Sequence, residues 1–170
     1  KTLSGLQALL GAKARLVRVM PNLGLRVGAG MSVYCRGAKA RVADGRRVKA
    51  IMETAGVVIE LNETHFDAVT ALSGSGPAFF AMLMQAMVAG AVAQGLPAES
   101  ALLLALQTML GTAQTLLQTG EAPADFIKAV TSPGGTTAAG LAVLEKSAVQ
   151  RTLARTIAAA AKRSATLSKA

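Results

Sequence analysis

The chain has 170 residues, 52% of them hydrophobic and 16% charged, a composition that supports a packed core and excludes intrinsic disorder. One cysteine and one histidine exclude an internal disulfide, a zinc ribbon and a histidine-rich cage, so we expect no metal site. The net charge of +9 raises the hypothesis of nucleic-acid binding, but no nucleic-acid-binding motif accompanies the basic clusters and aromatic residues make up only 3%. We therefore interpret the basic residues as solvated helix faces, and a nucleic-acid-binding protein stays an alternative that only the charge supports.

The first sixty residues alternate between helix and strand patterns. Helices are predicted at residues 3–10, before Gly11, and at residues 38–55, before Gly56. Short β-branched runs predict strands at residues 16–20, 31–35 and 57–61, with a glycine-rich loop at 22–30. Three strands without further sheet partners indicate the trailing part of an α/β domain over residues 1–62.

After residue 62 the pattern is entirely helical. Helices are predicted at residues 65–72, 77–94, 98–119, 124–130, 137–146 and 149–168. The fold class is therefore mainly α, with a helical domain over residues 63–170 preceded by the three-strand part.

Two of these helices lie in segments, residues 68–98 and 100–120, that contain no charged residue. Their length suffices for a membrane span, but they are rich in Ala, Gly, Ser, Thr and Gln, and no aromatic belt flanks them. The other reading is a helix that is apolar on all sides and buried in protein. The other predicted helices are too few to enclose both uncharged segments. We therefore expect the surplus apolar surface to form an obligate homodimer rather than to enter a membrane.

The segment from Ser132 to Thr137 is the most informative candidate site. Pro133 followed by two glycines opens directly into a helix, so the amides of Gly134, Gly135, Thr136 and Thr137 can converge on an anion. A small carboxylate fits better than a polyphosphate because no P-loop lysine follows. A well-capped helix start explains the same pattern.

Other motifs are weaker alone. Residues 73–77, Ser-Gly-Ser-Gly-Pro, form either a tight helix junction or a ligand cradle. Met20, Pro21 and Asn22 end a strand, at the edge where α/β sheets bind ligands. The nine acidic residues are scattered, and no pair of carboxylates at helical spacing lies inside an apolar segment, so acid–base hydrolysis has no candidate residues.

Taken together and in order, these motifs resemble the pyrroline-5-carboxylate reductase family. The resemblance covers nearly the whole chain and is carried by residues 20–22, 27–31, 67–78, 95–97, 131–141 and 144–145. Ser-Gly-Ser-Gly-Pro-Ala and Thr-Ser-Pro-Gly-Gly-Thr-Thr together are highly specific to it.

The resemblance implies an NADPH- or NADH-dependent reductase that makes proline by hydride transfer to the C=N bond of 1-pyrroline-5-carboxylate, without a metal. It implies a Rossmann-like domain before an intertwined helical dimerisation domain, and larger assemblies of dimers also occur in the family. The amides of residues 132–137 would hold the substrate carboxylate and the Thr137 hydroxyl would face the ring nitrogen. Met20, Pro21 and Asn22 would lie beside the nicotinamide and its ribose.

Three features depart from the family pattern. Leu23 and Gly24 replace the usual Thr-Pro, and Phe79 stands where a tyrosine often follows Gly-Pro-Ala. The glycine fingerprint that carries the cofactor's pyrophosphate is not in the chain. We therefore expect the 170-residue chain alone to be inactive and to bind NADPH weakly. A divergent, non-catalytic relative that keeps the helical dimer for assembly or regulation is the alternative.

The expected location is the cytoplasm. The sequence starts at Lys1 without a signal-peptide pattern of charged, apolar and small residues.

Overall fold

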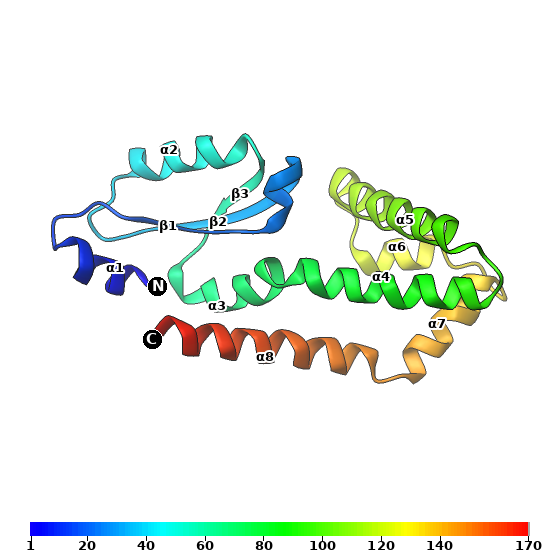
Figure 1. Ribbon diagram of the computed structural model, residues 1–170. Coiled ribbons are helices and arrows are strands. Elements are labelled where there is room, and N and C mark those ends of the chain that lie inside the picture. Colours follow the sequence, from blue (N-terminus) through cyan, green and yellow to red (C-terminus); the bar gives the residue numbers. More distant parts are fainter. Residues whose placement is uncertain (170) are drawn as a thin grey trace. The chain divides into compact units, whose positions relative to one another are not determined.

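The computed structural model describes residues 1–169, which divide into two compact units (Figure 1). The first unit combines Lys1–Phe79 with the chain from Leu153 onward, and the second is Phe80–Thr152. The segment 63–79 thus belongs with the sheet in space. The predicted domain boundary at residue 62 does not coincide with this division and stays a prediction about the family's domains.

The first unit is built on a three-stranded sheet with the order β1-β2-β3. β1 (Val17–Pro21) pairs with β2 (Gly30–Arg36) in antiparallel fashion, and β2 pairs in parallel with β3 (Gly56–Glu60). The helix α2 (Val42–Glu53) makes the crossover that a parallel pair requires. All three predicted strands are confirmed, with ends shifted by one residue.

Helices cover both faces of this sheet. In both views α2 lies along one face, while α1 (Leu3–Leu10) and α3 (Phe66–Val69) lie on the other (Figure 1). Gly45 lets α2 approach closely, because a Cβ there would lie 2.8 Å from the Arg36 Cδ and 3.1 Å from the Tyr34 ring. On the opposite face the buried residues Val33, Cys35 and Phe66 form the core.

Two predicted segments differ from the structure for local reasons. α2 begins at Val42 rather than residue 38, because Asp44 accepts the Arg41 amide at 2.8 Å and caps the helix there. The predicted loop 22–30 contains a 3₁₀ helix, η1 (Leu23–Val27), because the Asn22 side chain caps it by accepting the Gly24 amide.

The predicted helix 65–72 is in fact three short pieces. A 3₁₀ turn, η2 (Glu63–His65), leads into α3, and α3 leads into a π-helical turn, η3 (Thr70–Gly74). The Ser75 amide donates to the Thr70 carbonyl at 2.8 Å, five residues back, which widens the turn before α4 (Gly76–Ala93) begins.

The second unit contains most of α4 together with α5 (Ala98–Thr119), α6 (Pro123–Ala129) and α7 (Thr136–Lys146). These predicted helices are confirmed to within one residue. The stretches Glu63–Ala93 and Ala98–Thr119 are long and apolar enough to cross a membrane, and only 6% of each hydrophobic window is buried within the chain.

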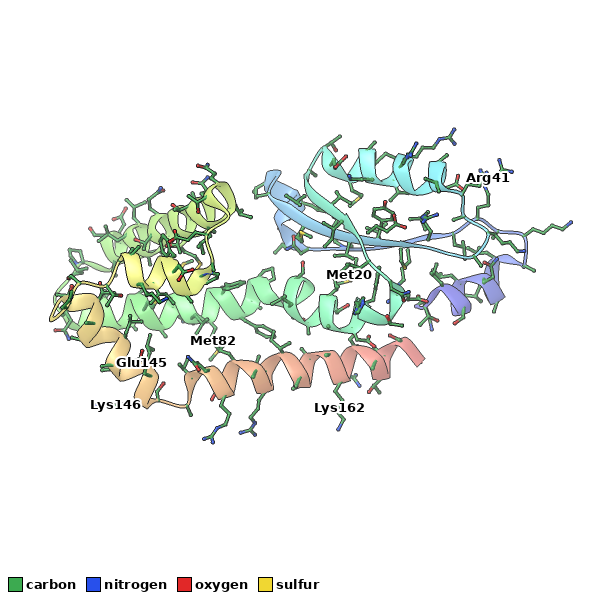
Figure 2. The ribbon with its side chains drawn as sticks, turned by 180° about the vertical axis from the view of Figure 1, so that it is seen from behind. Met20, Arg41, Met82, Glu145, Lys146 and Lys162 are labelled. Carbon is green, nitrogen blue, oxygen red and sulfur yellow. The ribbon has the colours of Figure 1, made fainter. Side chains whose placement is uncertain are left out.

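α8 (Val149–Lys169) returns the chain to the first unit. The Ser164 hydroxyl donates to Asp67 of α3 at 2.6 Å, which ties the two helices together. Figure 2 shows Lys162 projecting from α8 on the side away from α3. Lys162 is therefore exposed to solvent, in agreement with our interpretation of the basic residues in this segment.

Candidate active site

The loop before α7 is a turn that leaves several backbone donors open. The Gly135 amide donates to the Ser132 carbonyl at 3.0 Å, and Gly134 between them has a φ of +70°. This geometry, with Pro133 at the second position and a left-handed glycine at the third, is that of a type II turn. Glycine at 134 is therefore required by the backbone.

The first turn of α7 supplies the donors. The first intrahelical bond runs from Ala139 to the Gly135 carbonyl, and no side chain caps the helix. Within residues 1–169, the amides of Gly134, Thr136, Thr137 and Ala138 make no hydrogen bond. Unpaired amides at a helix start, together with the helix dipole, favour a bound anion.

The Gly135 amide does not join this group. It was predicted to face the anion, but it is engaged inside the turn with Ser132. A Cβ at Gly135 would also collide with the Ser132 hydroxyl oxygen, so this glycine keeps the turn closed. The set of open amides therefore differs from the predicted one by one residue, since Ala138 takes the place of Gly135.

The two threonine hydroxyls lie at the same place. Thr136 and Thr137 are both exposed, and neither hydroxyl is hydrogen-bonded within the part of the chain that the structure describes. Other threonines differ: the Thr131 hydroxyl, just before the turn, donates to the Ile127 carbonyl at 2.6 Å. Thr137 thus has a free hydroxyl next to free amides.

The other predicted site residues end β1 in the first unit. Met20 is partly buried against the core, on the side of the sheet that faces α3 (Figure 2). Pro21 is exposed and pairs with Ser32. Because β1 runs antiparallel to β2, its carboxyl end meets the amino ends of β2 and β3, so the edge is not the all-carboxyl edge of a parallel sheet.

Asn22 connects three segments at this corner. Its Oδ1 accepts the amides of Gly24 at 3.1 Å and Met31 at 3.0 Å, and its Nδ2 lies 3.4 Å from the Ser73 Oγ. A proline at position 24 would have no N–H for the first of these bonds, so the Leu23-Gly24 departure adds a donor to Asn22. Nearby residues, including Gly24, Ala29 and Pro77, line a hollow of about 570 Å³ with Asn22.

The structure therefore brings the predicted residues together in two groups. Met20, Pro21 and Asn22 lie in the first unit, and residues 132–137 lie in the second. Sequence reasoning did not select Ser73, although the Ser-Gly-Ser-Gly-Pro motif was the signal for it. Its contact with Asn22 depends on a π turn that the sequence did not predict.

Perturbed ionisable groups lie elsewhere. The Arg36 guanidinium, 2.6 Å from Glu60, lowers the pKa of that carboxyl, and the Tyr34 hydroxyl donates to it at 2.9 Å. Burial, followed by the bond to Glu60, raises the pKa of Tyr34. Arg36, Glu60 and Tyr34 join β2 to β3, which makes their role structural. No cluster of metal-binding side chains occurs among residues 1–169.

The second unit carries an apolar groove between α4 and α5. Its volume is about 520 Å³, and it is lined by residues including Phe80, Met84, Leu104, Thr108 and Leu116. Several of these side chains, such as Phe80 (55% exposed) and Leu104 (56% exposed), find no cover within the chain. This groove provides the uncovered apolar surface expected from the two uncharged segments.

Comparison with known proteins gives a consistent family. Residues 63–167 match the family model described as pyrroline-5-carboxylate reductase dimerisation. The chain is 46% identical over 155 residues to pyrroline-5-carboxylate reductase of Arabidopsis thaliana, covering 91% of this chain and 56% of that protein. It is 40% identical over 169 residues to the reductase of Schizosaccharomyces pombe, covering 99% and 60%.

Solved structures agree with these relatives. A pyrroline-5-carboxylate reductase from Coxiella burnetii superposes with a TM-score of 0.94 at 34% identity, covering 98% of this chain and 62% of that one. The reductase of Plasmodium falciparum with NADP bound gives a TM-score of 0.89 at 31% identity, covering 95% and 65%. The chain thus spans between half and two thirds of the length of these relatives.

Proposed function

Because this chain belongs to the pyrroline-5-carboxylate reductase family and carries its dimerisation domain, we propose that the protein containing it reduces 1-pyrroline-5-carboxylate to L-proline. The observation that carries the proposal is the open set of donors at the start of α7. Its amides and the Thr136 and Thr137 hydroxyls suit a small carboxylate beside a ring nitrogen.

The Thr137 hydroxyl has the most specific role. The amides of Gly134, Thr136 and Thr137 hold the carboxylate, and the Thr137 hydroxyl donates to the ring nitrogen and keeps the C=N bond in one orientation. Reduction of an imine depends mainly on such positioning and on proton supply to nitrogen. This explains why a chain without paired catalytic carboxylates suffices.

The cofactor is NADPH or NADH, which supplies the hydride when bound. The residues present fit its nicotinamide end: the Asn22 side chain holds the corner after β1 through the Gly24 and Met31 amides, and Gly74 lets the Met20 side chain pack closely against it. No glycine fingerprint for the pyrophosphate occurs in the sequence. The 170-residue chain alone therefore binds the dinucleotide weakly and is inactive, and micromolar NADPH affinity for it would contradict this.

The homodimer follows from the second unit. The apolar groove between α4 and α5 fits another copy of the chain better than lipid, since small residues such as Ala101 and Ala105 line it and let helices pack closely. The same helices are long and apolar enough to cross a membrane. The oligomeric state must therefore be measured in solution without detergent. A cytoplasmic location accompanies this proposal.

The test is steady-state NADPH oxidation by the full-length protein with 1-pyrroline-5-carboxylate. Replacing Thr137 with Val should lower kcat about a hundredfold, the scale of a lost proton-donating group. Thr115→Val on α5 is the matched control, because that hydroxyl already donates to the Gly111 carbonyl at 2.9 Å.

Unsubstituted 1-pyrroline, which lacks the carboxylate, should react with a much higher KM. Equal KM values for the two imines would mean that the α7 donors do not hold the carboxylate. A full-length protein that forms dimers but oxidises no NADPH with either imine would instead favour the non-catalytic assembly module.

A further inference from the structure

The Asn22 side chain has one possible orientation. Its Oδ1 faces the amides of Gly24 and Met31, at 3.1 Å and 3.0 Å. Because a backbone N–H only donates, the atom that faces these two amides must be the oxygen. The NH₂ group of Asn22 therefore faces Ser73, and the direction of that contact is fixed by the network.

Ser73 accepts in this contact and keeps its own hydrogen free. The Asn22 Nδ2 lies 3.4 Å from the Ser73 Oγ and can only donate to it. Within residues 1–169 the Ser73 hydroxyl donates to no acceptor. Two other hydroxyls of this region are engaged: Thr70 donates to the Phe66 carbonyl at 2.7 Å and Ser164 donates to Asp67 at 2.6 Å. Ser73 is thus a half-buried hydroxyl with its oxygen held and its hydrogen unused.

The backbone around Ser73 is also held in place. Ser75 closes the π turn by donating to the Thr70 carbonyl at 2.8 Å. Gly74 packs directly on the strand end, because a Cβ there would lie 2.5 Å from the Met20 Cε. Single π turns inside helices occur frequently at functional sites. The turn therefore presents Ser73 at the same corner as Met20 and Asn22.

We infer that Ser73 is a cofactor-binding residue with Asn22 as its positioning residue, and that the Ser73 O–H donates to the carboxamide oxygen of the nicotinamide ring. This inference rests on the proposed function, which places the nicotinamide end at this corner. The carboxamide oxygen is a neutral acceptor, which suits a neutral hydroxyl donor. The bond fixes the rotation of the carboxamide and hence of the ring.

The experiment measures the dissociation constant of NADPH for the full-length protein by fluorescence titration. Ser73→Ala should weaken binding roughly tenfold, the worth of one neutral hydrogen bond. Ser168→Ala is the matched control: its hydroxyl donates to the Ser164 carbonyl at 2.9 Å within α8, so its removal should leave the affinity unchanged.

Asn22→Asp separates positioning from folding. Aspartate still accepts the Gly24 and Met31 amides, so the corner keeps its shape, but it also accepts the Ser73 hydrogen and takes it from the cofactor. In the unchanged protein, Asn22→Asp should weaken NADPH binding both by its charge and by taking the Ser73 hydrogen. In a protein that already carries Ser73→Ala, only the charge acts, so the same substitution should weaken binding less. Thermal unfolding of each variant reports whether the fold is intact.

Two outcomes would overturn the inference. If Ser73→Ala binds NADPH as tightly as Ser168→Ala, Ser73 does not contact the cofactor. If Asn22→Asp has the same effect with and without the Ser73 hydroxyl, Asn22 does not position it. Both readouts are binding constants, so they stay informative even if the protein fails to reduce 1-pyrroline-5-carboxylate, which would overturn the proposed function alone.

Discussion

At the scale of single residues, two buried side chains of β2, Ser32 and Cys35, show how burial affects a polar group. Ser32 is fully buried, and its hydroxyl has no hydrogen-bond partner among residues 1–169. Its partners on the neighbouring strands are Pro21 and Val58. Neither residue has a polar side-chain atom that could bond to the Ser32 hydroxyl. Cys35 lies three residues further along the same strand, so its side chain points to the opposite face of the sheet, where it packs with Val33 in the core.

Cys35 gives a prediction for chemical reactivity. Burial, more than the nearby Glu63, raises the pKa of its thiol to about 11, and the residue is only 4% exposed. The thiolate is the reactive form, so the native protein should react with a thiol reagent at pH 8 orders of magnitude more slowly than the unfolded chain. Labelling with and without denaturant, followed by mass spectrometry, measures this.

The same shift has a sign for stability. The folded pKa lies above the unfolded value, so the contribution of the neutral thiol is fully present below about pH 8.5 and is lost as the pH rises toward 11. Cys35→Ala should flatten this part of the pH profile of unfolding free energy. Rapid labelling of native protein at pH 8 would show that the thiol is accessible and contradict the burial.

At the scale of elements, hydrophobic period and glycine or proline stops predicted most helices and strands. α5 has the predicted bounds because Pro97 precedes it and Gly120, with a φ of +67°, ends it. The π turn at Thr70–Gly74 was missed because nothing in its residue types distinguishes it from an ordinary helix. Its last residue, Gly74, packs against Met20, a contact between residues more than fifty positions apart that the local sequence does not indicate.

The candidate site divides in the same way. The turn at Ser132–Gly135 could be predicted, because proline and glycine at fixed positions dictate its backbone. That the Gly135 amide is consumed inside the turn could not, since it depends on where the Ser132 carbonyl points. Asn22 was selected for its place at a strand end, but its hydrogen bonds to Gly24 and Met31 come from the folded loop.

Two glycine substitutions test how these elements are held. A Cβ at Gly24 would lie 2.5 Å from the Ala29 carbonyl oxygen, a backbone atom that cannot move without opening η1. Gly24→Ala should therefore lower the free energy of unfolding by more than about 2 kcal/mol. A Cβ at Gly74 would clash with the flexible tip of Met20 and otherwise make an ordinary contact with Thr70, so Gly74→Ala should change the free energy of unfolding by about 1 kcal/mol or less.

Urea unfolding of the full-length protein and the two variants measures both effects. The comparison is internal, because each variant adds a single methyl group in the same unit. Equal losses at the two positions would mean that the backbone at Ala29 yields as easily as a methionine side chain, and that η1 is not a rigid part of the corner.

At the scale of the whole molecule, the chain's helices show apolar surface that a single copy leaves uncovered. α5 exposes successive leucines on different sides: Leu103 is 67% exposed and Leu104 is 56% exposed. Only Leu104 lines the groove with α4. Because both side chains are largely exposed within one copy, replacing either should cost that copy little folding free energy.

This pair of leucines therefore tests the proposed dimer. Leu104→Glu places a charge in the groove where a second copy would have to bury it, so the two-chain association should be lost or weakened at least a hundredfold. Leu103→Glu makes the same change outside the groove and should leave the dimer intact. Light scattering after size-exclusion chromatography measures the masses. A Leu104→Glu protein with the mass of the unchanged protein would show that the partner does not occupy this groove.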